Sequence, residues 1–490
     1  VDSSGHFREP VGWKPGIQII GTRVESSNGE RAVDGRAVHA GPVHSPGAWI
    51  EDAIRIEIDE SILDDNDAEP DDIAGLLELA LEDTSLVESI IGVPLYLPDA
   101  TFTPVELDYG RARLDLSPND GSLDGLVGID GIAIDFELDG VSWYSWFSTY
   151  GTASAGQVDV GFKLTVESAD GAVRCEATEF DVVIEDLEYD IHYVPDFLEG
   201  MTSGWAEDFI SSAVKDVVQQ DLLPQVEDIL TGFAVGATFD TDLSFELRLA
   251  EIDVVEDGLR FEVDARIGAI DAMALPLNAG SLDTDGTPPE WPTDKVQPFW
   301  AAVDDDLLNQ LGFAFWHTGV LKDVEFDGAW LTLMQGGPLP EPLGPVETVS
   351  MSLHLPPVVT ETKQDDWAAQ IALGEWELGF HREDGEVLRF SVNARSHLQA
   401  DIDDDGEIEL TVDSRPAHLE QAVGVIEAPS ALDPGDLSAL IRLLVPPLLG
   451  NAGSIVPELP VPEVPLDEFI DLPTTEGMTV RVADPSLRLE

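Results

Sequence analysis

Basic residues are scarce in this sequence. Lysine and arginine together number 24, against 97 aspartate and glutamate residues, which gives a formal net charge of −73 at pH 7. A surface this acidic repels nucleic-acid phosphates and anionic lipid headgroups, so we expect no nucleic-acid partner. Two interpretations of the charge stay open: solubility in a salty medium, or a dedicated face that binds a cation or a partner.

Cysteine and long apolar runs are also nearly absent. Cys175 is the single cysteine, so no intramolecular disulfide can form, and we expect its side chain to be a small buried apolar group. The apolar run 439–449 is too short to cross a membrane and contains Arg442 and two prolines. The chain begins at Val1 without methionine, so we expect a processed secreted or periplasmic protein whose signal peptide has been removed.

Motifs of common enzyme classes are missing as well. The sequence has no G-x-S-x-G, H-E-x-x-H or P-loop pattern. Residues 212–215 fit the S-x-x-K pattern of some acyl transferases, but they lack the companion motifs and lie on an amphipathic segment. We therefore predict that the protein is not an enzyme, because a lipid hydrolase would need a nucleophile that the sequence does not reveal.

Most of the chain has the alternating pattern of half-buried strands. Apolar and polar residues alternate in segments 54–59, 105–109, 132–138, 158–166, 180–189, 243–249, 259–263, 349–355 and 408–412. Asp-Gly pairs, which favour hairpin turns, occur at 139–140, 170–171, 257–258, 384–385 and 405–406. The pattern predicts meandering antiparallel sheets.

Four segments have helical spacing instead, and they begin at residues 71, 196, 304 and 434. The predicted helices cover residues 71–91, 196–233, 304–320 and 434–449. Asp71 and Asp72 suit a helix N-terminus, Pro224 predicts a kink, and Gly319 suits a C-terminal cap. Pro434 fits the first turn of the last helix.

The nearly equal spacing of these helices predicts a helix–sheet–helix unit that is used twice. We expect an N-terminal extension at residues 1–55, a first module at 56–245 and a second at 246–490, with the crossing between them at about 236–300. Each helix either covers one face of an ordinary α+β core, or lies inside a strongly curved sheet that leaves an apolar tunnel. The second helix favours the tunnel, since its full length would be roughly 57 Å.

Three stretches resemble the family of bactericidal/permeability-increasing protein and lipopolysaccharide-binding protein. Residues 288–321 are similar to the start of that family's C-terminal barrel, and the matching residues are Leu308, Asn309, Trp316, Gly319 and Leu321. Residues 189–198 and the long helix after them resemble the second helix of its N-terminal barrel. The tail resembles the family's C-terminal order: helix 434–449, the proline-rich segment 456–466, then a closing strand.

The resemblance implies an α+β fold of two elongated antiparallel β-barrels around long amphipathic helices, arranged as a pseudo-two-fold boomerang with a central sheet. It also implies an apolar lipid pocket in each barrel. The sequence departs from the family in two respects. Cys175 has no cysteine partner on the long helix, where Gln219, Gln220 and Val226 stand, and the hairpins that are basic in the family are acidic here.

We therefore predict a monomer that binds, and in one interpretation transfers, an acyl lipid such as a phospholipid, with no other cofactor. Burial of acyl chains needs only apolar side chains. The predicted tunnel residues are Leu76, Leu77, Phe197, Met201, Trp205, Phe209, Val214, Leu307, Leu311, Phe315, Leu440, Leu444 and Leu448. The alternative is a structural or adhesion module in which the same side chains pack a solid core.

Metal sites are only weakly indicated. Asp401, Asp403 and Asp405 form the opening of a calcium loop, but Val412 stands where such a loop needs a bidentate glutamate, which favours a hairpin turn. His39 and His44 have a spacing that matches no helical or hairpin metal site. The sequence therefore predicts no metal centre.

Overall fold

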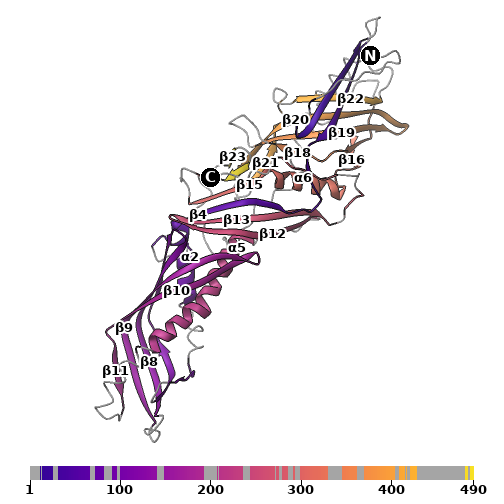
Figure 1. The fold of residues 1–490 in the computed structure, drawn as a ribbon. Coiled ribbons are helices and arrows are strands. Elements are labelled where there is room, and N and C mark those ends of the chain that lie inside the picture. The colour runs from indigo at the N-terminus through magenta and orange to yellow at the C-terminus, as the bar shows by residue number, and fades with distance from the viewer. Residues whose placement is uncertain are drawn as a thin grey trace.

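The molecule is elongated, and the three large sheets of the described chain lie in a row (Figure 1). A seven-stranded sheet lies at each end and a six-stranded sheet lies between them. All pairings of the described strands are antiparallel. The computed structural model describes residues 12, 14–25, 31–66, 72–81, 91–96, 100–140, 148–192, 207, 209–235, 243–270, 272–274, 279–284, 291–292, 298–328, 345–360, 369–402, 408–413, 415, 420–427, 480–483 and 486–489.

The first end sheet contains the longest strands of the described chain. Its members are β5 (Leu95–Tyr96), β6 (Ala100–Asp108), β7 (Ala112–Asn119), β8 (Ser122–Gly140), β9 (Ser148–Ala169), β10 (Ala172–Glu185) and β11 (Glu188–Ile191). The predicted turn at 170–171 joins β9 to β10, with left-handed φ values of 56° at Asp170 and 82° at Gly171. This φ pair suits the twist of a tight hairpin, so the local sequence determines this register.

One long helix lies along this sheet (Figure 1). Residues 209–217 are α-helical, a π-helical turn η2 follows at Val218–Leu222, and α5 continues over Leu223–Val235. Pro224 cannot donate a backbone hydrogen bond and crowds the preceding turn. The π-turn lies directly before Pro224 and is wider than an α-helical turn, since the Leu223 N–H donates to the Val218 carbonyl oxygen. The expected irregularity at Pro224 is therefore found as a π-turn.

The middle sheet joins segments that are far apart in the sequence. Its strand order is β12 (Leu243–Val255), β13 (Gly258–Ala269), β4 (Ile50–Asp59), β15 (Phe299–Asp304), β24 (Ser486–Leu489) and β23 (Val480–Ala483). Strand β4 therefore pairs with β13 on one side and with β15 on the other. Short helices α1 (Glu60–Leu63) and α2 (Ile73–Leu81) follow β4.

The second end sheet packs against the N-terminal hairpin, and its strand β18 contacts helix α6, which also packs on β13 of the middle sheet (Figure 1). Its strands are β16 (Val324–Asp327), β17 (Thr348–Leu353), β18 (Val358–Thr360), β19 (Ala369–Arg382), β20 (Gly385–Ile402), β21 (Ile408–Val412) and β22 (Glu420–Glu427). The hairpin β1 (Gly16–Glu25) and β2 (Arg31–Ala40) contacts β18, β19, β20 and β22. The first described strands of the chain thus pack against a sheet that is formed by residues more than three hundred positions later. For example, Asn393 donates a hydrogen bond to Gly35, 358 residues away.

Helix α6 spans Asp305–Thr318 and begins and ends as its sequence predicts. The Asp304 carboxylate accepts a hydrogen bond from the Asp306 N–H, and Gly319 ends the helix at φ 85°. A β-carbon on residue 319 would also lie 2.9 Å from the Met273 sulfur. Backbone conformation and space both favour glycine at this cap.

The structure confirms a fold rich in β-sheet with few helices, consistent with the predicted α+β class. The described strands form open sheets, and closed barrels are not found among them. In the first end sheet, α5 packs against β10 and α2 packs against β7, so helices cover the inner face that a closed barrel would enclose. The boomerang, the duplication and the three domain boundaries stay predictions, and residue 55 lies within β4. No helix of the described chain is long and apolar enough to cross a membrane.

Candidate functional site

An apolar cavity lies between the long helix and the first end sheet. It is located where two hydrophobic clusters meet, one around α2, η2 and the middle sheet and the other around Phe102, Phe136 and Phe209. The residues that line it are Leu81, Leu107, Tyr109, Ala112, Val127, Ile129, Ile132, Ile134, Phe209, Ile210, Ala213, Val214, Val217 and Val218.

The helix supplies one wall through a regular stripe of side chains. Phe209, Ile210, Ala213, Val214 and Val217 recur at the spacing that places residues on one face of an α-helix. The opposite face carries polar groups and is exposed, for example at residues 212 and 216. The amphipathic sequence thus orients the helix, because it buries this stripe against the sheet.

The sheet supplies the other wall at a place where strand β8 changes the side that it buries. Before residue 130 its buried side chains are at odd positions, such as Val127, and after it they are at even positions, such as Ile132 and Ile134. Gly131 lies at this change with φ 65°, a conformation that side chains other than glycine rarely adopt. The row of buried side chains is therefore interrupted at Gly131. The cavity lies over this interruption and is lined by residues from both parts of β8.

Phe209 is held in place by two further aromatic rings. Its ring centroid lies 4.6 Å from that of Phe102, which in turn lies 4.3 Å from that of Phe136. Contacts of this kind stabilise aromatic pairs beyond the burial of their area. The end of the cavity at Phe209 is therefore firmly packed.

The chemistry of the lining is almost entirely hydrocarbon. Among the described lining residues, Tyr109 is the one with a polar side-chain group, and its hydroxyl donates a hydrogen bond to the Leu81 carbonyl oxygen at 2.5 Å. Since no charged side chain is found in the described part of the lining, these residues offer neither a general base nor a metal ligand. It can take an apolar group by burial, as dry engineered cavities do.

The size of the cavity limits what it holds in this conformation. Its volume is about 60 Å³, whereas an engineered apolar cavity that binds benzene has a volume of about 150 Å³. A long acyl chain therefore requires the helix and the sheet to separate further than they do here.

Two predicted tunnel residues, Phe209 and Val214, line the cavity. Leu77, Leu307 and Leu311 are buried in the cluster that joins α2, α6 and the middle sheet, and Leu76 packs against that cluster. Phe315 packs against the core of the second end sheet. The other predicted residues lie outside the part of the chain that the structure describes: Phe197, Met201, Trp205, Leu440, Leu444 and Leu448.

The calcium prediction also falls mostly outside the described residues. Asp401 lies at the end of β20, and Asp403 and Asp405 are not described. This prediction stays untested.

The sheet wall of the cavity was not predicted from the sequence. Ile132 and Ile134 were assigned only to a strand, and Val127 and Ile129 were in none of the predicted segments, although the sequence contains a signal for the cavity. The alternation of apolar residues changes phase across Asp130 and Gly131, and a phase change on a strand marks a place where packing rows are broken.

Strand β10 is attached to α5 close to the single cysteine. The Glu227 carboxylate accepts hydrogen bonds from the Cys175 N–H at 2.8 Å and from the Arg174 guanidinium at 3.1 Å. The Thr231 hydroxyl accepts another from the Val173 N–H at 3.0 Å. Burial and the neighbouring Glu227 charge raise the pKa of the Cys175 thiol to about 12, so this thiol stays protonated at neutral pH.

Comparisons with known proteins give matches to solved structures alone. No protein-family model matches the chain, and no curated protein sequence matches it. The solved structures that are similar include lipopolysaccharide binding protein, at 12% identity and a TM-score of 0.44, over 91% of this chain and 98% of that one. P47 of Clostridium botulinum E1 matches at 8% identity and a TM-score of 0.27, over 84% of this chain and 90% of that one. Latherin matches at 14% identity and a TM-score of 0.17, over 35% of this chain and 90% of that one.

The first of these structures carries the name of the family that the sequence resembles. TM-scores this low do not establish a shared fold. The functional conclusion therefore depends on the cavity.

Proposed function

We propose that the protein binds an acyl lipid and that the cavity between the long helix and strands β6, β7 and β8 receives the lipid tail. The observation that supports this proposal is the hydrocarbon lining, which places Phe209, Val214, Val127 and Ile132 around one space without a charged group. Burial of an acyl chain there contributes about 0.8 kcal/mol per methylene. Several methylenes therefore give useful affinity without a specific polar contact.

The cavity has to widen for this function. Side chains of the helix and the sheet meet around the cavity. Beside it, the π-turn at Val218–Leu222 interrupts the regular helix. An interrupted helix bends at lower cost than a regular one. We place the widening in residues 209–222, which shift away from β8 as the chain enters.

The charge of the molecule restricts which lipid headgroups the protein can bind. With a net charge of −73 the surface repels anionic lipids, so a neutral or zwitterionic lipid, such as a phospholipid, fits best. We propose that the protein works as a secreted or periplasmic monomer and that it transfers lipid between membranes. Transfer of a labelled phospholipid from donor to acceptor vesicles tests this last step.

The binding proposal is tested with a variant that fills the cavity. Ala213 lines the cavity, and its neighbour Ser212 is exposed on the other face of the same helix. Ala213→Phe should weaken binding of a fluorescent zwitterionic phospholipid by at least about tenfold, the equivalent of roughly two buried methylenes. Ser212→Phe adds the same ring outside the cavity and should leave the affinity unchanged.

Circular dichroism establishes that both variants are folded, since overpacking costs about 1–3 kcal/mol. The purified protein should also release lipid into organic solvent, detected by mass spectrometry. If neither extracted lipid nor saturable probe binding is found, the side chains form a solid core and the protein is a structural or adhesion module. Equal affinity of Ala213→Phe and wild type would place the ligand elsewhere.

A further inference from the structure

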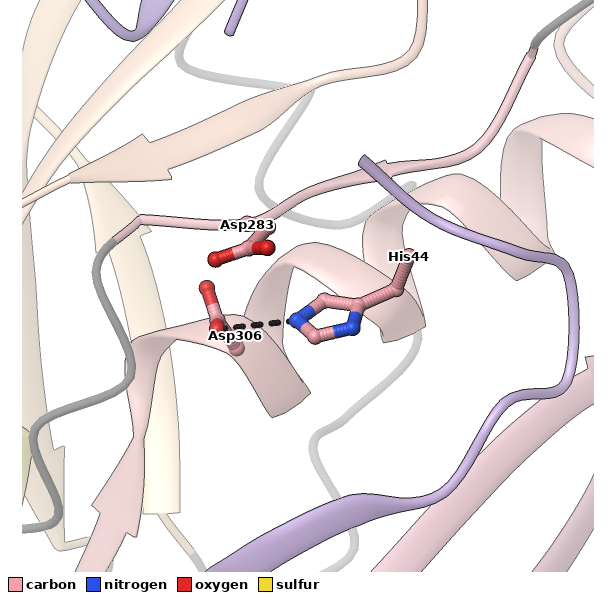
Figure 2. Close-up of side chains that lie close together, drawn as sticks. All are labelled: His44, Asp283 and Asp306. Atoms are coloured by element: carbon pink, nitrogen blue, oxygen red, sulfur yellow. Dashed lines mark hydrogen bonds and ion pairs between the residues drawn. The ribbon is translucent and has the colours of Figure 1, made fainter. Parts of the chain in front are cut away.

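A compact polar cluster lies beside the N-terminus of helix α6, far from the apolar cavity along the molecule. His44, Asp283 and Asp306 come from three separate segments, and Figure 2 shows their side chains converging on one point. One possible ligand atom of each lies within 4.8 Å of the other two. The His44 Nε2 and the Asp306 Oδ2 are 3.0 Å apart.

Local structure brings these residues together in a defined way. His44 ends the two-residue strand β3 (Val43–His44), which pairs with β14 (Ser281–Leu282), and Ser281 lies directly opposite His44. Residues opposite each other in an antiparallel pair share one face, and so do residues two apart on a strand. Ser281 and Asp283 therefore project on the side of His44, and Leu282 packs on the other side in a small apolar cluster.

The Asp306 carboxylate is arranged as an oriented ligand. Its Oδ1 accepts a hydrogen bond from the Thr284 N–H at 2.8 Å and shares the Thr284 hydroxyl proton with the Asp305 carboxylate, each oxygen lying 2.7 Å from the hydroxyl. Its Oδ2 is left to face His44, and the side chain is 3% exposed. In metal sites, outer-shell hydrogen bonds orient a carboxylate in the same way: they hold one oxygen so that the other points at the metal.

Two groups in the cluster lack the partners that burial and charge require. The Ser281 hydroxyl is buried, at 2% exposure of the residue, and finds no hydrogen-bond partner among the residues that the structure describes. Within the described residues, no hydrogen bond or ion pair reaches the Asp283 carboxylate, which faces that of Asp306 (Figure 2). A buried hydroxyl without a partner and two facing carboxylates are both costly.

The local charge is also unbalanced. Asp304 and Asp305 stand next to Asp306, and in the described chain no lysine or arginine forms an ion pair with these three or with Asp283. The dipole of α6 offsets only about half an elementary charge at its N-terminus. Within the described residues, His44 is therefore the only basic side chain that pairs with these carboxylates.

We propose that His44, Asp283 and Asp306 bind a divalent transition-metal ion of the zinc type. One imidazole nitrogen and two carboxylate oxygens suit Zn²⁺, Co²⁺ or Mn²⁺ better than Ca²⁺, which prefers oxygen ligands alone. Ligand atoms around a tetrahedral Zn²⁺ lie about 3.3 Å apart, given bonds of about 2.0 Å, close to the His44–Asp306 distance. The metal takes the place of the proton between Nε2 and Oδ2, and a water held by the Ser281 hydroxyl completes its shell.

The role that follows is structural. The ion joins the segment after the N-terminal hairpin, the segment after β14 and the start of α6. Helix α6 lies between the middle sheet and the second end sheet, where it contacts β13 and β18 (Figure 1). A ligand that binds only the folded state raises the melting temperature as its concentration rises. This inference does not depend on lipid binding.

Cobalt binding to the full, chelator-treated protein tests the site. We expect one Co²⁺ per chain, with the visible absorption of four-coordinate cobalt, displaced by Zn²⁺ and retained in excess Mg²⁺ and salt. Asp283→Asn should weaken binding by at least about 100-fold, since outer-shell changes alone cost 10- to 100-fold. This variant should fold, because the Asp283 side chain makes no hydrogen bond with the described residues.

His44→Ala should remove the same absorption. His354→Ala is the matched control, because His354 pairs with Glu377 at 3.4 Å on an exposed surface and should bind cobalt as the wild type does. Cobalt bound equally by wild type and Asp283→Asn, or displaced completely by Mg²⁺, would overturn the proposal, since surface carboxylates alone bind in that way. Saturable binding of Ca²⁺ without Co²⁺ would overturn it as well.

Discussion

Individual side chains show how this very acidic chain uses carboxylates inside the fold. Asp72 precedes α2, is 2% exposed, and accepts hydrogen bonds from the N–H groups of Gly75 and Asp65, each at 2.6 Å. Asp64 accepts one from the Leu116 N–H at 2.8 Å and so joins α1 to β7. These carboxylates satisfy buried backbone donors at a helix end and between elements. They act as structural acceptors, in contrast to the carboxylates on the surface.

Asp72 gives a prediction about pH. Burial, followed by the charges of Asp64 and Asp65, raises its pKa from 3.8 to about 6, although its two hydrogen bonds oppose the shift. The folded state therefore binds this proton more tightly than the unfolded state, so its contribution to stability falls as pH rises from about 4 to about 6. A shift of this size corresponds to at most roughly 3 kcal/mol.

The change to test is Asp72→Asn, which cannot titrate. Urea unfolding of both proteins at several pH values should give a stability difference that favours the wild type most at pH 4.5 and least at pH 7. Subtraction removes the pH dependence of all other groups. A difference that is constant over this range would show that Asp72 has an ordinary pKa.

At the scale of elements, one helix irregularity and two side-chain attachments decide how the strands and helices meet. The π-turn at Val218–Leu222 lets the helix continue past Pro224, and Glu227 attaches α5 to β10. Asn393 attaches the N-terminal hairpin to the second end sheet: its side chain accepts a hydrogen bond from the Glu375 N–H at 2.8 Å and donates one to the Gly35 carbonyl oxygen at 3.3 Å. Each attachment satisfies polar groups that burial would otherwise leave unpaired.

Asn393→Ala should loosen the hairpin. Asn393 is 0% exposed, and its loss leaves two backbone groups without a partner at a cost of about 1–3 kcal/mol. We expect faster amide hydrogen exchange in β1 and β2 and a lower unfolding midpoint. Asn119→Ala removes only an exposed contact with Asp124 and should change neither quantity. Unchanged exchange in β1 and β2 of the first variant would mean that apolar contacts alone hold the hairpin.

At the scale of the whole molecule, the net charge opposes the compact state. The surplus of carboxylates is not matched by cations, since the chain has 24 basic residues for 97 acidic ones. Repulsion among exposed charges is screened by salt, and the Debye length falls from about 30 Å at 0.01 M to about 3 Å at 1 M. Stability should therefore depend on ionic strength more than in a protein of balanced charge.

Melting temperature measured by calorimetry should rise with NaCl concentration from 0.01 M to 1 M at pH 7. The same titration near pH 4.1, the isoelectric point of the sequence, serves as the control, because net repulsion is then small and the increase should shrink. An equal increase at both pH values would mean that salt acts on apolar burial and not on charge.

The sequence by itself determined the features that depend on neighbouring residues. The strand alternation, the turn at Asp170 and Gly171, the cap at Gly319 and the irregularity at Pro224 follow from side-chain periodicity and backbone preference within a few residues. Phe209 and Val214 were found because an amphipathic helix buries its apolar stripe. Local physics is sufficient for such elements.

Tertiary structure alone decided which distant segments meet. Nothing in the sequence places β4 between β13 and β15, the hairpin on the second end sheet, or His44 next to Asp306 across 262 residues. The spacing of His39 and His44 carries no signal for this cluster, because the groups near His44 are carboxylates from helix α6 and the segment after β14. Such contacts depend on the packing of whole sheets and helices, and their order along the chain carries no local signal.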